Sequence, residues 1–181
     1  MRKKLEEKIK IPEGVSCSYE NNILRCAKDS IILEKKIHIP TVKVKTSESE
    51  ISLICEKGNK NDYKKIMTVI AHIKNLFAGL NKNYIYQLEI CHVHFPVTLK
   101  VEGNKLAIAN FFGEKKPRHG MILPNVEVQI SGQKITVSSP DKEAAGQTAA
   151  NFERATKLRN KDRRIFQDGI YIVKKPEVQH E

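Results

Sequence analysis

Alternating apolar and polar residues predict β-strands in both halves of the chain, and the two halves match at a constant separation. Pro12 corresponds to Pro96 and Pro40 to Pro124, and 96 minus 12 and 124 minus 40 both give 84 residues. Because successive side chains of a strand point to opposite faces, such alternation indicates strands with one buried face. Recurrence at a fixed separation predicts two structural repeats.

The match is closest around the second proline of each half. Residues 37–44 (IHIPTVKV) correspond to residues 121–128 (MILPNVEV). Ile-Ser-Leu from Ile51 likewise corresponds to Ile-Thr-Val from Ile135. In both halves we therefore expect an alternating strand after the proline, then a turn and a second alternating strand.

A helix is predicted at the end of the first half. Asn61 and Asp62 are candidate caps at its start, and Gly79 marks its end. Between them, apolar residues recur at intervals of three and four, which builds one apolar face. These residues are Ile66, Val69, Ile70, Ile73 and Phe77.

A second helix is predicted at the equivalent place in the second half. Ser139 offers a hydroxyl cap, Pro140 a proline at the first helical position, and Asp141 a carboxylate near the positive helix end. Its apolar face consists of Ala145, Thr148, Ala149 and Phe152. Such small side chains predict close packing on a sheet, with Gly146 at the closest approach at a cost of about 1 kcal/mol in helix propensity. The Gly-Gln and Ala-Ala pairs fit packing and direct RNA contact equally well.

These elements predict an α+β protein with two similar domains in tandem. Residues 19–22 and 102–105, the latter with Gly103, are expected to form hairpin turns between further strands. We place the domains at residues 1–82 and 83–181, each a mostly antiparallel sheet with one helix packed on a face. The opposite sheet face would remain free for a partner.

Composition argues against a membrane or secreted protein. The 181 residues are 40% hydrophobic, but no run of about 18 apolar residues occurs, and the N-terminal MRKKLEEKIKIP lacks the apolar centre of a signal peptide. A cytoplasmic location is expected. Cys17, Cys26, Cys55 and Cys91 are widely spaced without a C-x-x-C pair, which predicts reduced thiols, mostly buried in strands.

The charge predicts a polyanionic partner. The formal net charge is +11 and the pI about 9.5. A surface of this kind attracts phosphate and releases condensed counterions on contact, so nucleic acid is the leading partner. An anionic membrane would instead require a basic amphipathic helix with aromatic anchors, and we find none in the sequence.

The densest positive charge lies in residues 154–164, which hold six basic residues against Asp162 alone. A second basic segment, residues 113–118 (GEKKPR), follows two phenylalanines. A third, formed by Arg2, Lys3, Lys4, Lys8 and Lys10, is partly offset by two glutamates. Basic residues are commonly just solvated, but six cations within eleven residues repel one another unless a polyanion is near. If five or six engage phosphates, log affinity should fall against log salt with a slope of about −4 to −5.

An enzymatic interpretation would start from Cys91, His92 and His94, since thiol and imidazole are common nucleophiles and metal ligands. In a strand the two histidines share one face, and the sequence offers no third ligand. Phosphate-binding glycine loops and the G-x-S-x-G elbow do not occur in the sequence. We therefore expect no enzymatic activity and no cofactor, and a thiol-dependent or metal-dependent hydrolase is the weakest alternative.

Three motifs connect the chain with a known family. They are NFFGEK at residues 110–115, DKEAAGQTAAN at residues 141–151 and DRRIFQDGIY at residues 162–171. Together with the tandem repeat, they resemble the universal large-subunit ribosomal protein number six family in its archaeal and eukaryotic branch. The resemblance covers nearly the whole length. It implies two similar α+β domains, no catalytic activity, and binding of ribosomal RNA mainly through the second domain.

The resemblance also implies a place in the cytoplasmic ribosome, near the sarcin-ricin loop, the stalk base and the site where translational GTPases dock. The expected partners are large-subunit rRNA and neighbouring ribosomal proteins, without a membrane or small-molecule substrate. The alternative is an RNA-binding protein that acts off the ribosome. Under the ribosomal hypothesis, Gln147 and Asn151 are expected to bond sugar or base edges. The predicted phosphate contacts are Lys115, Lys116, Arg118, Arg154, Lys157, Arg159, Lys161, Arg163 and Arg164.

Overall fold

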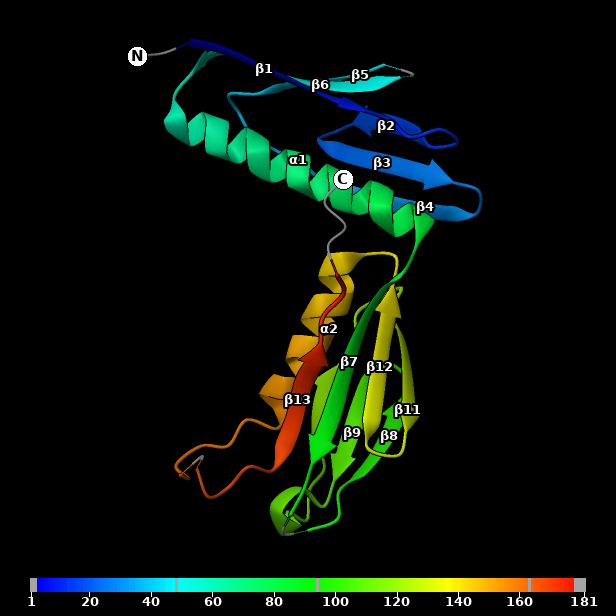
Figure 1. Cartoon of the computed structure of the whole chain (residues 1–181), viewed down its shortest axis with the longest axis vertical. Coiled ribbons are helices and arrows are strands. Elements are labelled where there is room, and N and C mark those ends of the chain that lie inside the picture. The colour runs from blue at the N-terminus through cyan, green and yellow to red at the C-terminus, as the bar shows by residue number, and fades with distance from the viewer. Residues whose placement is uncertain (1–2, 48, 94, 163, 178–181) are drawn as a thin grey trace. The chain divides into compact units, whose positions relative to one another are not determined.

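The computed structural model describes residues 3–47, 49–93, 95–162 and 164–177. The chain divides into two compact units, Met1–Lys82 and Asn83–Glu181 (Figure 1). The elements of unit 1 are β1 (Lys3–Lys10), β2 (Ser16–Glu20), β3 (Ile23–Lys28), β4 (Ile31–Lys36), β5 (Lys43–Thr46), β6 (Glu50–Gly58) and α1 (Lys60–Asn81). Those of unit 2 are β7 (Tyr84–Cys91), β8 (Thr98–Glu102), β9 (Lys105–Ala109), the 3₁₀ turn η1 (Phe111–Gly113), β10 (Arg118–Met121), β11 (Glu127–Ser131), β12 (Lys134–Ser139), α2 (Lys142–Ala155) and β13 (Gly169–Lys174).

Unit 1 consists of antiparallel sheets covered by α1. The strand orders are β1-β6-β5 and β2-β3-β4, and α1 packs against strands of both sheets (Figure 1). Burial alternates along β6, where Ile51, Leu53 and Cys55 point into the core. These side chains meet the apolar face of α1, whose residues Ile66 and Ile73 have no exposed surface. The alternation predicted from sequence therefore marks the core-facing side.

Unit 2 repeats this arrangement and adds one strand. Its strand orders are β11-β12-β7-β13 and β10-β9-β8, so β11-β12-β7 matches β5-β6-β1 and β10-β9-β8 matches β4-β3-β2. The helix α2 contacts β10, β12, β7 and β13. The predicted α+β class is confirmed. Lys43 and Glu127 begin corresponding strands, as do Glu50 and Lys134, so the separation of 84 residues holds through the sheets.

The start of α1 differs from the prediction. Asn59, not Asn61 or Asp62, is the N-cap, and its side chain accepts hydrogen bonds from the backbone N–H groups of both those residues, at 2.8 and 2.9 Å. The Asp62 carboxylate accepts in return the N–H of Asn59, at 3.0 Å. This reciprocal capping box satisfies helix donors that would otherwise lack partners, which places the first turn two residues earlier.

The end of α1 is also later than predicted, whereas its apolar face is confirmed. All five residues predicted for that face are buried. Gly79 lies inside the helix, and the helix continues to Asn81. Leu80 is buried on the same face, and burying a leucine contributes about 1.5–3 kcal/mol, which exceeds the cost of about 1 kcal/mol for a helical glycine.

In α2 the predicted face is confirmed and the predicted cap is shifted. Asp141 is the N-cap, and its carboxylate accepts the N–H of Glu143 at 2.9 Å. Ser139 lies before the helix, where its hydroxyl donates to the Asn125 carbonyl and accepts the N–H of Asp141. Pro140 therefore precedes the cap and does not occupy the first helical position. An aspartate carboxylate next to the free helical N–H groups is the better acceptor.

Close packing of α2 on its sheet is confirmed. Ala145, Thr148, Ala149 and Phe152 have no exposed surface. A Cβ atom placed on Gly146 would lie 2.9 Å from the Tyr86 hydroxyl oxygen, and one placed on Gly120 would lie 2.5 Å from Cδ1 of Phe152. Neither position has room for a methyl group unless a neighbour moves, so both glycines are explained by the helix-to-sheet distance.

The hairpins and cysteines lie mostly where expected. Asn21 and Asn22 adopt left-handed φ angles of 51° and 64° in the β2–β3 turn, and Gly103, at 56°, begins the β8–β9 turn. The free cysteines lie in β2, β3, β6 and β7. Cys91 departs from the prediction because it is exposed at the end of β7. Within the described part of the chain, no helix has the length and apolar composition to cross a bilayer.

Candidate nucleic-acid interface

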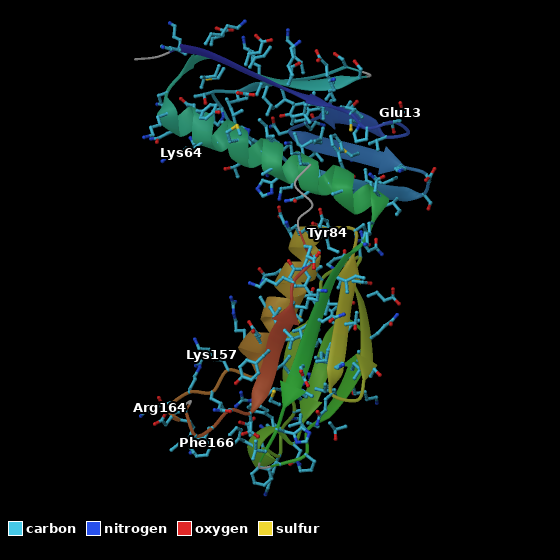
Figure 2. All side chains as sticks on the ribbon, in the orientation of Figure 1. Glu13, Lys64, Tyr84, Lys157, Arg164 and Phe166 are labelled. Carbon is cyan, nitrogen blue, oxygen red and sulfur yellow. The ribbon has the colours of Figure 1, made fainter. Side chains whose placement is uncertain are left out.

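The densest basic segment lies between the last helix and the last strand. We call residues 156–168, which connect α2 to β13, the basic loop. It carries Lys157, Arg159, Lys161 and Arg164, all exposed, and Figure 2 shows Lys157 and Arg164 along its course. Arg154 is exposed in the last turn of α2. Arg163, also predicted to contact phosphate, lies outside the described residues.

Thr156 fixes the beginning of the basic loop to its end. The side chain is buried, and its hydroxyl donates to the carbonyl oxygens of Phe152 and Glu153, each at 3.3 Å. The same hydroxyl oxygen accepts the N–H of Ile170 in β13 at 2.9 Å. One turn earlier, the Glu153 carboxylate accepts the N–H of Ile172 at 3.1 Å. Both ends of the basic loop are therefore anchored to α2.

A turn at Asp162 shapes the tip of the basic loop. Its carbonyl oxygen accepts the N–H groups of Ile165 and Phe166, and its carboxylate accepts the N–H of Arg164 at 3.0 Å. The carboxylate also pairs with the Arg164 guanidinium at 2.8 Å. These hydrogen bonds lower the pKa of Asp162 and raise the pKa of Arg164, although both residues are exposed. Asp162 thus organises the turn and partly offsets one cation.

Aromatic contacts bring the basic loop to the second basic segment. The Phe166 ring lies 5.7 Å, centroid to centroid, from Phe112 in η1. Phe112 packs edge-on against the buried Phe111 at 5.3 Å, and the Lys161 ammonium lies over the Phe166 ring at 5.4 Å. Because η1 leads directly into residues 113–118, two basic segments distant in sequence become neighbours in unit 2 (Figure 2).

Arg118 strengthens this connection and is itself already occupied. Its Nη1 donates to the carbonyl oxygen of Ala155 at the end of α2, at 3.1 Å. Its Nε and Nη2 donate to the Glu114 carboxylate at 2.8 and 2.5 Å, and the guanidinium lies 4.5 Å above the Phe111 ring. The hydrogen bonds from Arg118 lower the pKa of Glu114. Arg118 therefore holds η1 against α2 and is less available to an external phosphate than the lysines beside it.

Five other cations of the two basic segments and the end of α2 are available to bind an external anion. Lys115, Lys116, Arg154, Lys157 and Arg159 are exposed and form no ion pair with any acidic residue that the structure describes. Like charges held this close together repel one another, and a bound polyanion would relieve that repulsion. We call these five residues, together with Lys161 and Arg164, the cationic surface.

Gln147 and Asn151 differ in their availability. Gln147 is exposed, and its amide nitrogen donates to the Asn151 side-chain oxygen at 2.9 Å. Asn151 is half-buried and donates to the Met121 carbonyl at 3.1 Å, which connects α2 to β10. Gln147 is thus the more accessible of the two to an external ligand.

The Cys91 region has a structural anchor that the sequence did not indicate. Buried Asp168, at the end of the basic loop, accepts the N–H of Val93 at 2.8 Å. β7 ends at Cys91, so His92 lies beyond the strand, and His94 lies outside the described residues. Over the described ranges, no group of three or more His, Cys, Asp or Glu side chains could hold a metal ion.

The third basic segment is partly neutralised by ion pairs. Lys4 pairs with Glu6 at 2.9 Å, and Lys8 pairs with Glu50 at 3.0 Å. Arg2 lies outside the described residues. These lysines project from the solvent face of the β1-β6-β5 sheet, where solvent screens ion pairs so that they contribute little to stability. The segment therefore presents less net charge than the cationic surface of unit 2.

Unit 2 presents unpaired cations on one half of a duplicated α+β scaffold, and a surface of this kind attracts polyanions. The family model described as "Ribosomal protein L6" matches residues 95–169. Large ribosomal subunit protein uL6 of Methanosarcina mazei is 41% identical over 97% of this chain and 99% of its own length. The uL6 protein of Sulfurisphaera tokodaii is 39% identical over 94% of this chain and 92% of its own length. The uL6 protein of Methanospirillum hungatei is 36% identical over 96% of this chain and 98% of its own length.

The chain therefore belongs to the uL6 family of ribosomal proteins. The resemblance found in the sequence is thereby confirmed. The family is structural and not enzymatic, which agrees with the expectation that the chain has no catalytic activity.

Proposed function

We propose that this protein is a structural constituent of the large ribosomal subunit and that unit 2 binds large-subunit rRNA through the cationic surface. Family membership supports the first part. The observation that carries the second is the convergence of the basic loop and residues 113–118, joined by the contact of Phe112 with Phe166 and by Arg118. This convergence turns two basic segments into one surface.

The surface is suited to the phosphate backbone and not to reading base sequence. Lysine and arginine side chains that extend from an anchored loop can reach phosphates on the outside of an A-form helix, whereas its deep groove excludes them. We assign phosphate contact to the cationic surface and to Arg163, and contact with sugar or base edges to Gln147. Arg118 and Asn151, which were predicted to contact RNA, are assigned a positioning role because their donors already have partners.

The proposed location is near the sarcin-ricin loop, the stalk base and the site of translation factors in the cytoplasmic ribosome. The family resemblance supports this location, with stalk-base ribosomal proteins as neighbours and translational GTPases nearby. A chain bound there must tolerate the salt concentration of the cell, so RNA shape must add to the electrostatic attraction.

The test is a quadruple variant, Lys157→Ala, Arg159→Ala, Lys161→Ala and Arg164→Ala, titrated with a large-subunit rRNA fragment that contains the sarcin-ricin stem-loop. We expect the negative slope of log affinity against log salt to become shallower by about 3, because four phosphate contacts are removed. The matched control is Lys4→Ala, Lys8→Ala, Lys43→Ala and Lys45→Ala in unit 1. It removes the same charge and should leave the slope nearly unchanged.

Equal losses in the two variants would show that overall charge, and not this surface, governs binding. A competition experiment between the same fragment and an unrelated RNA hairpin tests the alternative, an RNA-binding protein that acts off the ribosome. Indifference between the two RNAs, together with loss from purified large subunits in a high-salt wash, would favour that alternative. Retention on the subunits would exclude it.

A further inference from the structure

Two cysteines that are separated in the sequence meet in the β2–β3 hairpin of unit 1. The Sγ atoms of Cys17 in β2 and Cys26 in β3 are 3.1 Å apart. The two residues are direct partners in the antiparallel register. Cys26 has no exposed surface, whereas Cys17 is half-buried. The chain therefore holds a dithiol with one half-buried and one fully buried cysteine.

The hairpin register is compatible with a covalent bond between these sulfurs. Asn21 and Asn22 form a two-residue turn, so the pair Glu20 and Ile23 closes the hairpin. Hydrogen-bonded and non-hydrogen-bonded pairs alternate from there, which makes the cysteines a non-hydrogen-bonded pair. The Cα atoms of such pairs are about 4.5 Å apart, within the range of about 4.4–6.8 Å that a disulfide spans.

We propose that Cys17 and Cys26 are a redox-sensitive modification site that forms an intrachain disulfide by exchange with a low-molecular-weight disulfide. The Cys17 thiolate attacks one sulfur of that disulfide, which gives a mixed disulfide and expels one thiolate. Cys26 loses its proton to solvent and attacks Sγ of Cys17, which expels the second thiolate. Two protein thiols are oxidised to one disulfide, and one external disulfide is reduced to two thiols.

The surroundings of the two sulfurs determine this order of attack. Cys17 is the more exposed of the two and is the one assigned to meet an external reagent, because Cys26 is enclosed in the core. A hydrogen bond with Cys26 lowers the pKa of Cys17, which increases its thiolate fraction. The hydrogen bond with Cys17, followed by burial, raises the pKa of Cys26. Once the mixed disulfide has formed, the second attack is intramolecular and its sulfurs are already adjacent.

The disulfide would join neighbouring strands of the unit 1 core. Residues 17–26 would become a closed loop, which reduces the conformational freedom of the unfolded chain. We expect the midpoint of thermal unfolding of the oxidised protein to rise by about 5 °C or more relative to the reduced protein. Reduction with a dithiol reagent should reverse the shift.

The experiment incubates the full-length protein with oxidised glutathione at neutral pH, followed by intact mass measurement and peptide mapping without reduction. The expected product carries one glutathionyl group and, apart from that group, has lost two hydrogen atoms, and it contains a Cys17–Cys26 cross-linked peptide. Exposed Cys91 is the internal control, and it should carry a stable glutathione adduct. The variant Cys26→Ser should retain the adduct at Cys17, and Cys17→Ser should leave Cys26 unmodified.

Two results would overturn the proposal. One is a wild-type protein whose Cys17 keeps its glutathione adduct while Cys26 remains a thiol. The other is modification of Cys91 alone, with Cys17 and Cys26 both unreacted. Neither result depends on whether the variants fold, since both are read from the wild-type chain.

Discussion

The two repeats of this protein have sheets with matching strand orders, but their helices end differently. Four large apolar side chains in the last turns of α1 are buried, namely Ile73, Leu76, Phe77 and Leu80. The residues 84 positions later in the second repeat are Lys157, Asn160, Lys161 and Arg164. Where the first repeat buries four apolar side chains, the second repeat thus presents three cations and one asparagine. The proposed RNA contact lies where the duplicated scaffold has diverged.

This divergence explains why α2 ends early. A helix is stabilised mainly by the apolar face that it buries, and residues 156–165 lack that face. Thr156 instead directs the chain out of the helix, and β13 returns it to the sheet beside β7. The corresponding edge of unit 1 is β1, whose exposed lysines discourage pairing with another strand. The same fold therefore serves packing in one repeat and charge presentation in the other.

The largest expected effect is a loss of stability when Phe77, one of the four large apolar residues buried at the end of α1, is truncated. Phe77→Ala should lower the free energy of unfolding by about 3–5 kcal/mol, because it leaves a cavity in unit 1. Lys161→Ala, at the corresponding position, should change stability by at most about 0.5 kcal/mol and weaken RNA binding. Urea denaturation of both variants measures the contrast. A comparable loss of stability in Lys161→Ala would show that the basic loop is part of the core.

A smaller effect is expected at the residue that ends α2. Thr156→Val keeps the shape of the side chain but leaves the buried N–H of Ile170 without its acceptor, which should cost about 1–3 kcal/mol. The matched control is Thr68→Val in α1, whose hydroxyl bonds the Lys64 carbonyl on the exposed surface. That change should stay within about 0.5 kcal/mol. Equal values would mean that the bridge from Thr156 to β13 contributes little.

The caps of the two helices should differ modestly. Asn59 accepts two backbone N–H groups and Asp141 accepts one. Asn59→Ala should therefore cost about 1–2 kcal/mol and Asp141→Ala about 0.5–1 kcal/mol, within the usual range for caps. Chemical denaturation of the two variants would measure both losses of stability. A larger loss for Asp141→Ala than for Asn59→Ala would contradict the cap geometry.

The smallest effect concerns Glu114, which has no acidic counterpart at Ser30 in the first repeat. Hydrogen bonds from Arg118 lower its pKa below the ordinary value of 4.5, so its ionised form stabilises the fold at neutral pH. This contribution is present above pH 4.5 and is lost as the pH falls through the lowered pKa. Glu114→Gln should cost less than about 1 kcal/mol at pH 7, because the Glu114 side chain is exposed and solvent screens the pair. The difference from wild type should disappear in acid, and its persistence there would contradict the assigned role.

Much of the fold could be predicted because hydrophobic spacing directly reports which side faces the core. The alternation of Ile51 and Leu53 and the helical spacing of Ile66 and Ile73 required no knowledge of distant contacts. The caps were less predictable, since Asn59, Asn61 and Asp62 are all good cap residues and only backbone geometry distinguishes them. The role of Arg118 was similarly hidden, because an arginine in a basic segment has the same composition whether its donors are free or occupied.

By itself the sequence determined the repeat, the α+β class, the apolar faces of both helices and the family, since each depends on the order and spacing of residues along the chain. Only the tertiary structure decided which polar groups meet. It brought Phe112 to Phe166, Thr156 to β13 and Cys17 to Cys26. These contacts join residues whose separations follow no local period, so their distances exist only once the sheets and helices have packed.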